Sequence, residues 1–124
     1  MDYKKIDPSL ELMKEFSKVT NGMPALIEQM RQKAIFSEGA VPKKFKILTA
    51  MIWAISARCE PCFKYYVQQA VQAEATEKEL GEFLAIASTM GGCVGEMWAL
   101  KAYSAFKKNN EDSDSGAQGE HCCS

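Results

Sequence analysis

Apolar residues recur every three or four positions along most of this chain, and this spacing constrains the fold more than any other feature. Such a repeat places the apolar side chains on one face of an α-helix. No run alternates apolar and polar residues with β-branched side chains, as a half-buried strand would. The sequence therefore predicts an all-α fold of about six helices.

Capping and breaking residues divide the chain into these helices. Asp7-Pro8 suits a helix start, because aspartate caps the first amides and the fixed φ of proline fits the first turn. Gly22 is expected to end that helix, since glycine readily adopts the left-handed conformation. Thr76 and Glu79 have the spacing of a capping box, which starts a later helix. The predicted helices cover about residues 8–20, 24–36, 42–57, 61–71, 77–90 and 94–107.

We expect one domain, residues 1–108, followed by a tail. A chain of 124 residues buries roughly two thirds of its unfolded surface, which is enough for one core without disulfides. Residues 109–124 contain no large aliphatic or aromatic side chain, so burial cannot offset the entropy of ordering them. We predict that they are disordered. The tail ends in His121, Cys122 and Cys123. These residues could bind a soft metal or exchange disulfides with Cys59 and Cys62, and the alternative is a disordered end without a function.

The charges are balanced, with 15 basic and 16 acidic residues and a net charge of -1. This balance argues against nucleic acid and membrane surfaces as partners, since both are recognised through excess positive charge. No uninterrupted apolar stretch approaches the roughly 20 residues of a membrane span, and no secretory signal opens the chain. We therefore expect a cytoplasmic protein, in which a Cys-x-x-Cys indicates redox or metal chemistry rather than a structural disulfide.

Cys59 and Cys62 are the candidate reactive residues. Their spacing at a helix start puts both sulfurs on one face, and Pro61 lets the first turn tighten enough for a disulfide. The amides and dipole of a helix N-terminus stabilise a thiolate, to which Arg58 and Lys64 add positive charge. Two other interpretations stay open: buried cysteines that only pack, and half of a zinc site.

Three segments together resemble the carboxymuconolactone decarboxylase and alkylhydroperoxidase D group. They are Ala57 to Tyr66, the helix start Ala75-Thr76-Glu77-Lys78-Glu79, and the break Met90-Gly91-Gly92. The likeness spans about residues 43–106. It implies an all-helical subunit that assembles into a homo-oligomer, a trimer or a hexamer, and in the redox branch a Cys-x-x-Cys that reduces peroxide without a cofactor.

Carried onto this sequence, the resemblance implies a peroxidatic Cys62 and a resolving Cys59. A hydroperoxide would oxidise Cys62 to a sulfenic acid, which would condense with Cys59 to a disulfide. A dithiol reductant protein would then restore the pair through a mixed disulfide. A protein disulfide is the alternative substrate.

Two positions depart from the peroxidase branch, which has a histidine four residues after the second cysteine and a glutamate twelve before the first. Here these positions are Tyr66 and Ile47. Tyrosine is a poor base at neutral pH, because its ordinary pKa is about 10, and isoleucine cannot transfer a proton. We therefore expect thiol–disulfide exchange more than peroxide reduction, with Tyr66 as a third candidate site residue. A core or subunit-contact role for Tyr66 is the competing interpretation.

Two further functions are considered. One is a non-catalytic helical module that has lost the proton relay. The other is a lactone decarboxylase working by acid–base chemistry, for which Glu60, Glu82 and Glu96 are the candidate carboxylates. We expect the remaining residue of interest, Cys93, to be a buried packing residue, because free cysteine is among the most buried residue types.

Overall fold

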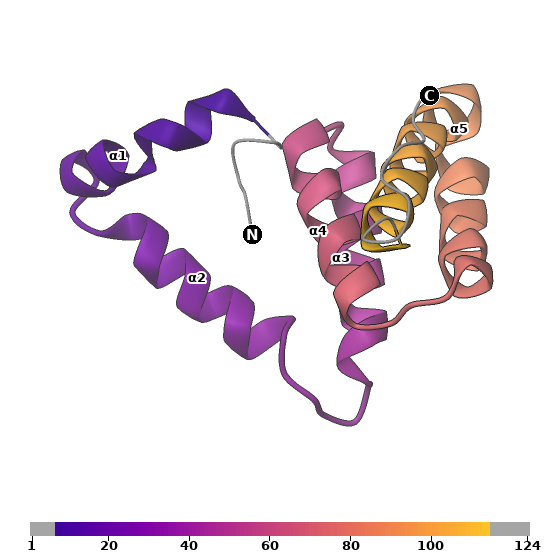
Figure 1. The fold of residues 1–124 in the computed structure, drawn as a ribbon, viewed down its shortest axis with the longest axis horizontal. Coiled ribbons are helices and arrows are strands. Elements are labelled where there is room, and N and C mark those ends of the chain that lie inside the picture. Colours follow the sequence, from indigo (N-terminus) through magenta and orange to yellow (C-terminus); the bar gives the residue numbers. More distant parts are fainter. Residues whose placement is uncertain (1–6, 115–124) are drawn as a thin grey trace.

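The computed structural model describes residues 7–114 and the side chains of residues 7–111. Over these residues it contains only helices and their connections (Figure 1), so the all-α prediction is confirmed. The elements are the 3-10 helix η2 (Pro8–Leu12) and the α-helices α1 (Met13–Val19), α2 (Met23–Ala34), α3 (Lys43–Ser56), α4 (Glu60–Gln72) and α5 (Glu77–Asp114).

The predicted caps form. The Asp7 carboxylate accepts a hydrogen bond from the Ser9 amide at 2.9 Å, at the start of η2. Gly22 has a φ of 83° and lies between α1 and α2. At the start of α5, the Thr76 hydroxyl accepts from the Glu79 amide at 3.0 Å, and the Glu79 carboxylate accepts from the Thr76 amide at 2.9 Å. The capping-box prediction is therefore confirmed.

The core lies between α3, α4 and α5, each of which packs against the other two. The sequence marks α3 as central because it is apolar on several sides, and five of its residues are buried. The largest fully buried side chains are Phe63, Phe106, Ile47, Leu48, Met51, Leu80 and Val67.

A glycine-dependent kink divides α5 into two segments that lie beside each other (Figure 1). Gly92 has a φ of 63° and a ψ of -146°, which an L-residue with a Cβ atom rarely adopts. The two segments correspond to the last two predicted helices. Because the chain bends here, Leu80 from the first segment and Phe106 from the second reach the same core.

The last helix continues further than the sequence predicts. We expected it to end near Lys107, with disorder from residue 109, but α5 continues to Asp114. Adding a residue to an existing helix gains a hydrogen bond without a new nucleus, so polar residues can extend it without a core contact. The Asn109 side chain also donates to the Ala105 carbonyl at 2.8 Å. His121, Cys122 and Cys123 lie outside the described residues.

Residues 8–34, here called the N-terminal arm, extend away from this core (Figure 1). Along this arm η2 lies against α1 and α1 against α2, whereas the backbones of all three stay apart from those of α3, α4 and α5. Many of the arm's large apolar side chains are consequently exposed: Leu12, Met13, Phe16, Val19, Met23, Leu26, Ile27 and Met30. The apolar periodicity predicts these helices. It does not predict that their apolar faces stay exposed in the single chain.

By length and composition, α5 between Glu77 and Glu111 is long and apolar enough to cross a membrane, with a mean hydropathy of 1.3 in its 18-residue window. Ser88, Thr89 and the glycines interrupt the apolar run, so the segment does not stand out in the sequence as an uninterrupted apolar stretch. Core helices of globular domains meet the same criterion. Only 17% of the window is buried within the chain, so α5 also presents an apolar surface outward.

Gly95, three residues after the kink, allows a close contact between the two segments of α5. A Cβ atom there would lie 2.6 Å from the Ala87 carbonyl oxygen. We expect Gly95→Ala to force a backbone shift and to lower the free energy of unfolding by about 1–3 kcal/mol. Urea denaturation followed by circular dichroism measures the change.

Gly81→Ala is the matched control, because a Cβ atom at this position in the same helix meets nothing within 4 Å. It should raise the free energy of unfolding by about 0.5–1 kcal/mol, as expected for glycine to alanine in a helix. Equal effects of the two substitutions would contradict the close contact at Gly95.

Candidate functional site

The site is built on the turn that joins α3 to α4. Arg58 adopts a φ of 57°, in the left-handed region, and the Cys59 amide donates to the Ala54 carbonyl of α3 at 3.0 Å. This bond closes the end of α3 and reverses the chain. Cys59 itself has extended backbone angles and is the N-cap of α4, where its carbonyl accepts from the Phe63 amide at 3.0 Å.

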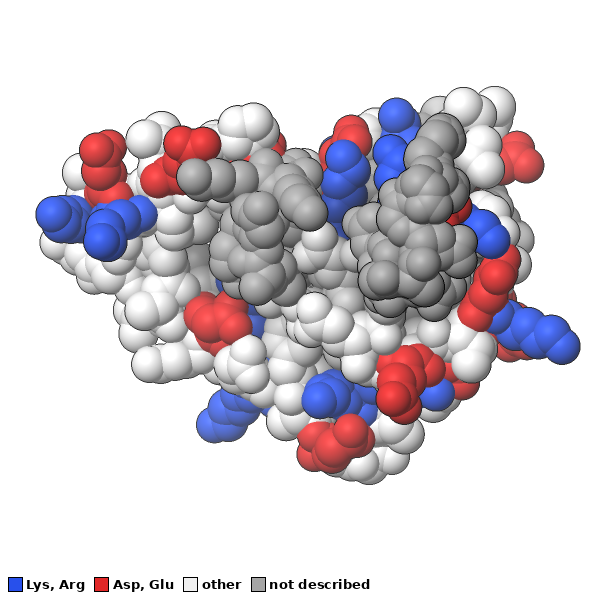
Figure 2. Space-filling view, in the orientation of Figure 1, with Lys and Arg blue, Asp and Glu red and all other residues white. Residues whose placement is uncertain are grey.

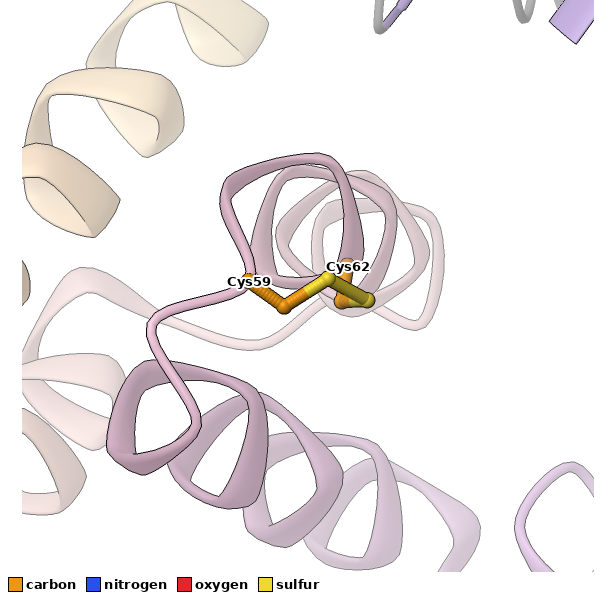
Figure 3. The surroundings of a disulfide bond; sticks show 2 residues. All are labelled: Cys59 and Cys62. Atoms are coloured by element: carbon orange, nitrogen blue, oxygen red, sulfur yellow. A yellow bond between two sulfur atoms is a disulfide. The ribbon is translucent and has the colours of Figure 1, made fainter.

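Cys59 and Cys62 form a disulfide at this end of α4 (Figure 3). Their Cα atoms are 5.2 Å apart, within the roughly 4.4–6.8 Å usual for disulfides. The sequence predicts closure through a tightened first helical turn. In the structure Cys59 stays outside the helix, and Pro61 occupies the first turn without needing an amide bond.

The disulfide is not sealed in the core. Cys59 and Cys62 are both of intermediate exposure, and Cys62 also packs against the buried cluster. Cys62 is followed by Phe63, which is fully buried and meets the Trp98 ring edge-on at 6.1 Å. The pair is thus rigidly anchored on one side and open to solvent on the other.

The charges at the start of α4 largely neutralise each other. Lys64 forms an ion pair with Glu60 at 2.9 Å, one turn earlier on the same helix. The hydrogen bond and the positive charge of Lys64 hold the pKa of Glu60 below its ordinary value. The lysine is therefore engaged by Glu60, and the helix N-terminus and the exposed Arg58 remain as the positive influences on the cysteines.

Tyr66 lies one turn after Cys62 on the same face of α4. Side chains on a helix lean toward its N-terminus, so Tyr66 leans over the turn that carries Cys62. Its ring stacks on Phe36 with centroids 6.2 Å apart and planes at 19°, and it meets Tyr65 edge-on at 5.1 Å. Tyr66 thus takes part in an aromatic cluster, one helical turn after Cys62.

Arg31 is a neighbour of Tyr66 that sequence reasoning missed. Its guanidinium donates to the Glu28 carboxylate at 3.1 Å and lies within electrostatic and hydrogen-bonding reach of the Tyr66 hydroxyl. Burial lowers the pKa of Arg31, but the bonds to Glu28 and Tyr66 outweigh burial and raise it above its ordinary value. The sequence spacing of Glu28 and Arg31 indicates only a local ion pair, and no local pattern links them to Tyr66.

Ile47, at the position of the relay glutamate in the peroxidase branch, is buried in the core with an exposed fraction of 1%. This position therefore contributes packing and no proton transfer. Of the three carboxylates considered for lactone chemistry, Glu60 is half-buried and Glu82 and Glu96 are exposed. None of the three carboxylates is buried in the core.

Cys93 differs from its prediction. We expected it to be buried, but it is exposed and is the free cysteine among residues 7–114. The kink at Gly92 explains the difference, because it rotates the helix face that follows and turns Cys93 outward.

Among the side chains of residues 7–111, no three from His, Cys, Asp or Glu gather closely enough to hold a metal ion. Acidic and basic side chains are interspersed on the face of the molecule shown in Figure 2, rather than separated by sign.

An all-helical subunit with a Cys-x-x-Cys disulfide at a helix start and a glycine-kinked helix after it defines the class of this protein. A sequence profile of the carboxymuconolactone decarboxylase family matches residues 22–105. The chain belongs to that family.

Relatives and solved structures agree with this assignment. An uncharacterized protein of Cupriavidus necator is 32% identical over 102 residues, which cover 81% of this chain and 90% of that protein. The apo structure of lpg0406, a carboxymuconolactone decarboxylase family protein from Legionella pneumophila, is similar with a TM-score of 0.78 and 30% identity, covering 86% of this chain and 96% of that one. The Thermotoga maritima protein TM1620 has the same fold, with a TM-score of 0.75 at 23% identity and coverage of 92% and 100%.

The different environments of the cysteines predict a labelling pattern. Under native, non-reducing conditions iodoacetamide should alkylate Cys93, whereas Cys59 and Cys62 should appear in one peptide with the mass of a disulfide. Dithiothreitol should then expose both to alkylation. Peptide mapping by mass spectrometry measures each site separately, and urea-unfolded protein is the control for complete labelling. Protection of Cys93 in the native protein would contradict its exposure.

Proposed function

We propose that this protein is a thiol–disulfide oxidoreductase that cycles Cys59 and Cys62 between a disulfide and a dithiol. The observation that carries the proposal is the partly exposed disulfide at the N-terminus of α4 in a member of this family. A disulfide that only stapled the fold would join distant segments, whereas this one closes a loop of four residues and can contribute little to stability.

Reduction of the pair follows from disulfide chemistry. A thiolate of a dithiol protein attacks one sulfur of the pair, forms a mixed disulfide and releases the other cysteine as a thiolate. The partner's second thiol then attacks the mixed disulfide and releases the remaining cysteine. Two electrons pass to the pair, two protons accompany them, and the partner leaves as a disulfide. In reverse, the dithiol reduces a protein disulfide.

The position of the pair favours this exchange. A thiolate at the first turn of α4 faces unpaired amides and the positive end of the helix dipole, and both lower the cost of the charged form. Because Cys62 also rests against the core, its sulfur is held in place when the bond opens.

The peroxide-reducing role is the finer part of the proposal and rests on the family resemblance. The Cys62 thiolate would attack the outer oxygen of a hydroperoxide, giving a sulfenic acid and an alkoxide that is protonated to the alcohol. The Cys59 thiol would then condense with the sulfenic acid and release water. Tyr66 is the candidate donor for the leaving oxygen, since a phenol donates a hydrogen bond well even where it is a poor base.

We also propose that the protein acts as a homo-oligomer in the cytoplasm. Three features support assembly: the exposed apolar faces of the N-terminal arm, the exposed apolar surface of α5 and the short length of α2. A 12-residue helix is marginal in water unless another surface covers it. The rival function is a non-catalytic assembly module. The exposed apolar surfaces are consistent with it as well, but it does not explain why the disulfide is accessible.

Single substitutions test the redox function. Cys62→Ser should abolish peroxide-dependent thiol consumption, and Cys59→Ser should stop after one oxidation event because the sulfenic acid has no partner. With oxidised glutathione either variant should stop at a mixed disulfide, because no second cysteine is present to displace the glutathione, and trapping with mass spectrometry detects this species. Cys93→Ser is the control and should behave as the parent. If all four proteins reacted alike, the mechanism would be wrong.

Assembly is tested by size-exclusion chromatography with light scattering. The parent should have three or six times its chain mass of 13.8 kDa. Phe16 is 53% exposed in the single chain. If this face is a subunit interface, Phe16→Glu should shift the mass toward the monomer, because a charge is disfavoured in the core of an interface. Lys18→Glu on the same helix is the control. A monomeric parent, or a parent recovered only with membranes, would contradict the proposal.

A further inference from the structure

A cavity of about 160 Å³ lies between the end of α3 and the kink of α5. Its apolar walls are formed by Ile52, Ile55, Ile86, Met90, Val94 and Trp98. Met90 is 82% exposed, so the cavity opens to solvent and is not a void in the core. The exchange chemistry proposed above gives this cavity no role.

Residues next to both cysteines connect the cavity with the disulfide. Arg58 lines the cavity and directly precedes Cys59, so their Cα atoms are about 3.8 Å apart. Trp98 lines it too, and its ring meets Phe63, the residue after Cys62, edge-on at 6.1 Å. A protein chain whose thiol reaches the disulfide can therefore place a neighbouring residue in the cavity, because one extended residue spans roughly 3.3–3.6 Å.

The volume of the cavity fits one large side chain. An apolar cavity of roughly 150 Å³ holds a benzene ring, whereas pockets for drug-sized molecules measure about 300–1,000 Å³. The walls present branched aliphatic, thioether and indole groups, which pack well against a phenyl ring. A phenylalanine or leucine side chain therefore matches the cavity in size and polarity.

The charge at the cavity favours an acidic group beside that side chain. Of the residues that line the cavity, Arg58 alone is charged. It is exposed, and no carboxylate of residues 7–111 forms an ion pair with it. Lys101 adds a second cation, with its Nζ 5.5 Å from the centre of the Trp98 ring. A carboxylate on the partner would complement this positive edge.

We propose that this cavity is a docking pocket for the dithiol protein that reduces the disulfide. The pocket takes a large apolar side chain beside the partner's reactive cysteine, and an acidic residue next to that side chain pairs with Arg58. The inference deepens the proposed redox function and rests on it, since it specifies the sequence that the reductant presents. The bonds exchanged are those described above, so docking changes the rate of reduction and not its products.

The test compares synthetic dithiol peptides as reductants of the full-length oxidised protein. Each peptide carries Cys-Gly-Pro-Cys, preceded by Glu-Phe, Glu-Ala or Gln-Phe, and mass spectrometry after acid quenching gives the rates. The Glu-Phe peptide should react about five- to twentyfold faster than Glu-Ala, because the pocket removes part of the phenyl ring from water. It should react about two- to fivefold faster than Gln-Phe, the size expected for an exposed ion pair.

Filling the pocket tests its role directly. Val94→Trp and Ile86→Trp each add bulk from a different segment of α5, and each should bring the ratio of the Glu-Phe and Glu-Ala rates close to one. Met97→Trp is the matched control, because Met97 is exposed on the same segment as Val94 but does not line the cavity. Circular dichroism and light scattering compare the fold and mass of each variant with those of the parent.

Arg58→Asn tests the charge, because asparagine tolerates the left-handed backbone that Arg58 adopts. The ratio of the Glu-Phe and Gln-Phe rates should fall close to one, while the advantage of Phe over Ala remains. Lys33→Gln removes an exposed charge on α2 and is the control.

Equal rates of the parent with Glu-Phe and Glu-Ala, or a ratio that both filling variants leave unchanged, overturn the docking pocket. A filling variant that dissociates and reacts more slowly with every peptide also overturns it, because the cavity then lies against a second copy of the chain. Failure of the proposed function has a different signature, in which the parent disulfide resists dithiothreitol and all three peptides alike.

Discussion

The hydrogen bond from the Cys59 amide to the Ala54 carbonyl is the interaction on which the site depends. It ends α3, reverses the chain and leaves Cys59 as the N-cap of α4 rather than a residue inside it. This requires Arg58 in the left-handed region, at a cost of roughly 1 kcal/mol for a residue with a Cβ atom. The disulfide, the helix N-terminus behind it and the buried Phe63 all follow from this one turn.

Burial is distributed unevenly, and the distribution matches the proposed roles. The three helices around the cysteines bury their apolar faces against one another, which holds the pair on a fixed support. The N-terminal arm leaves most of its apolar face exposed, and Phe36, two residues after it, stacks on Tyr66 of α4. One segment of the chain therefore supplies both a surface suited to assembly and a charged residue beside Tyr66.

The site contains few strong charges. Lys64 is neutralised by Glu60, and Ile47 removes the carboxylate expected in the peroxidase branch of the family. The N-terminus of α4 and the exposed Arg58 remain as the positive influences on a thiolate there. Thiol–disulfide exchange needs a thiolate that a partner can reach, whereas other reactions need a strong base. The site is therefore better suited to exchange.

The sequence by itself determined the helices, their caps and the cysteine pair, because each depends on residues within one or two turns. Apolar periodicity predicted every core helix, Thr76 and Glu79 predicted their capping box, and the Cys-x-x-Cys predicted a pair of cysteines able to close a disulfide. It also led to two wrong expectations, the early end of the last helix and a buried Cys93.

Only the tertiary structure decided which helix faces meet. Whether Cys93 is buried depends on a rotation at Gly92, and whether Arg31 reaches Tyr66 depends on how the chain folds back after α2. These relations join residues on different helices, whose contacts are set by packing across the whole domain and leave no periodic signal in the sequence.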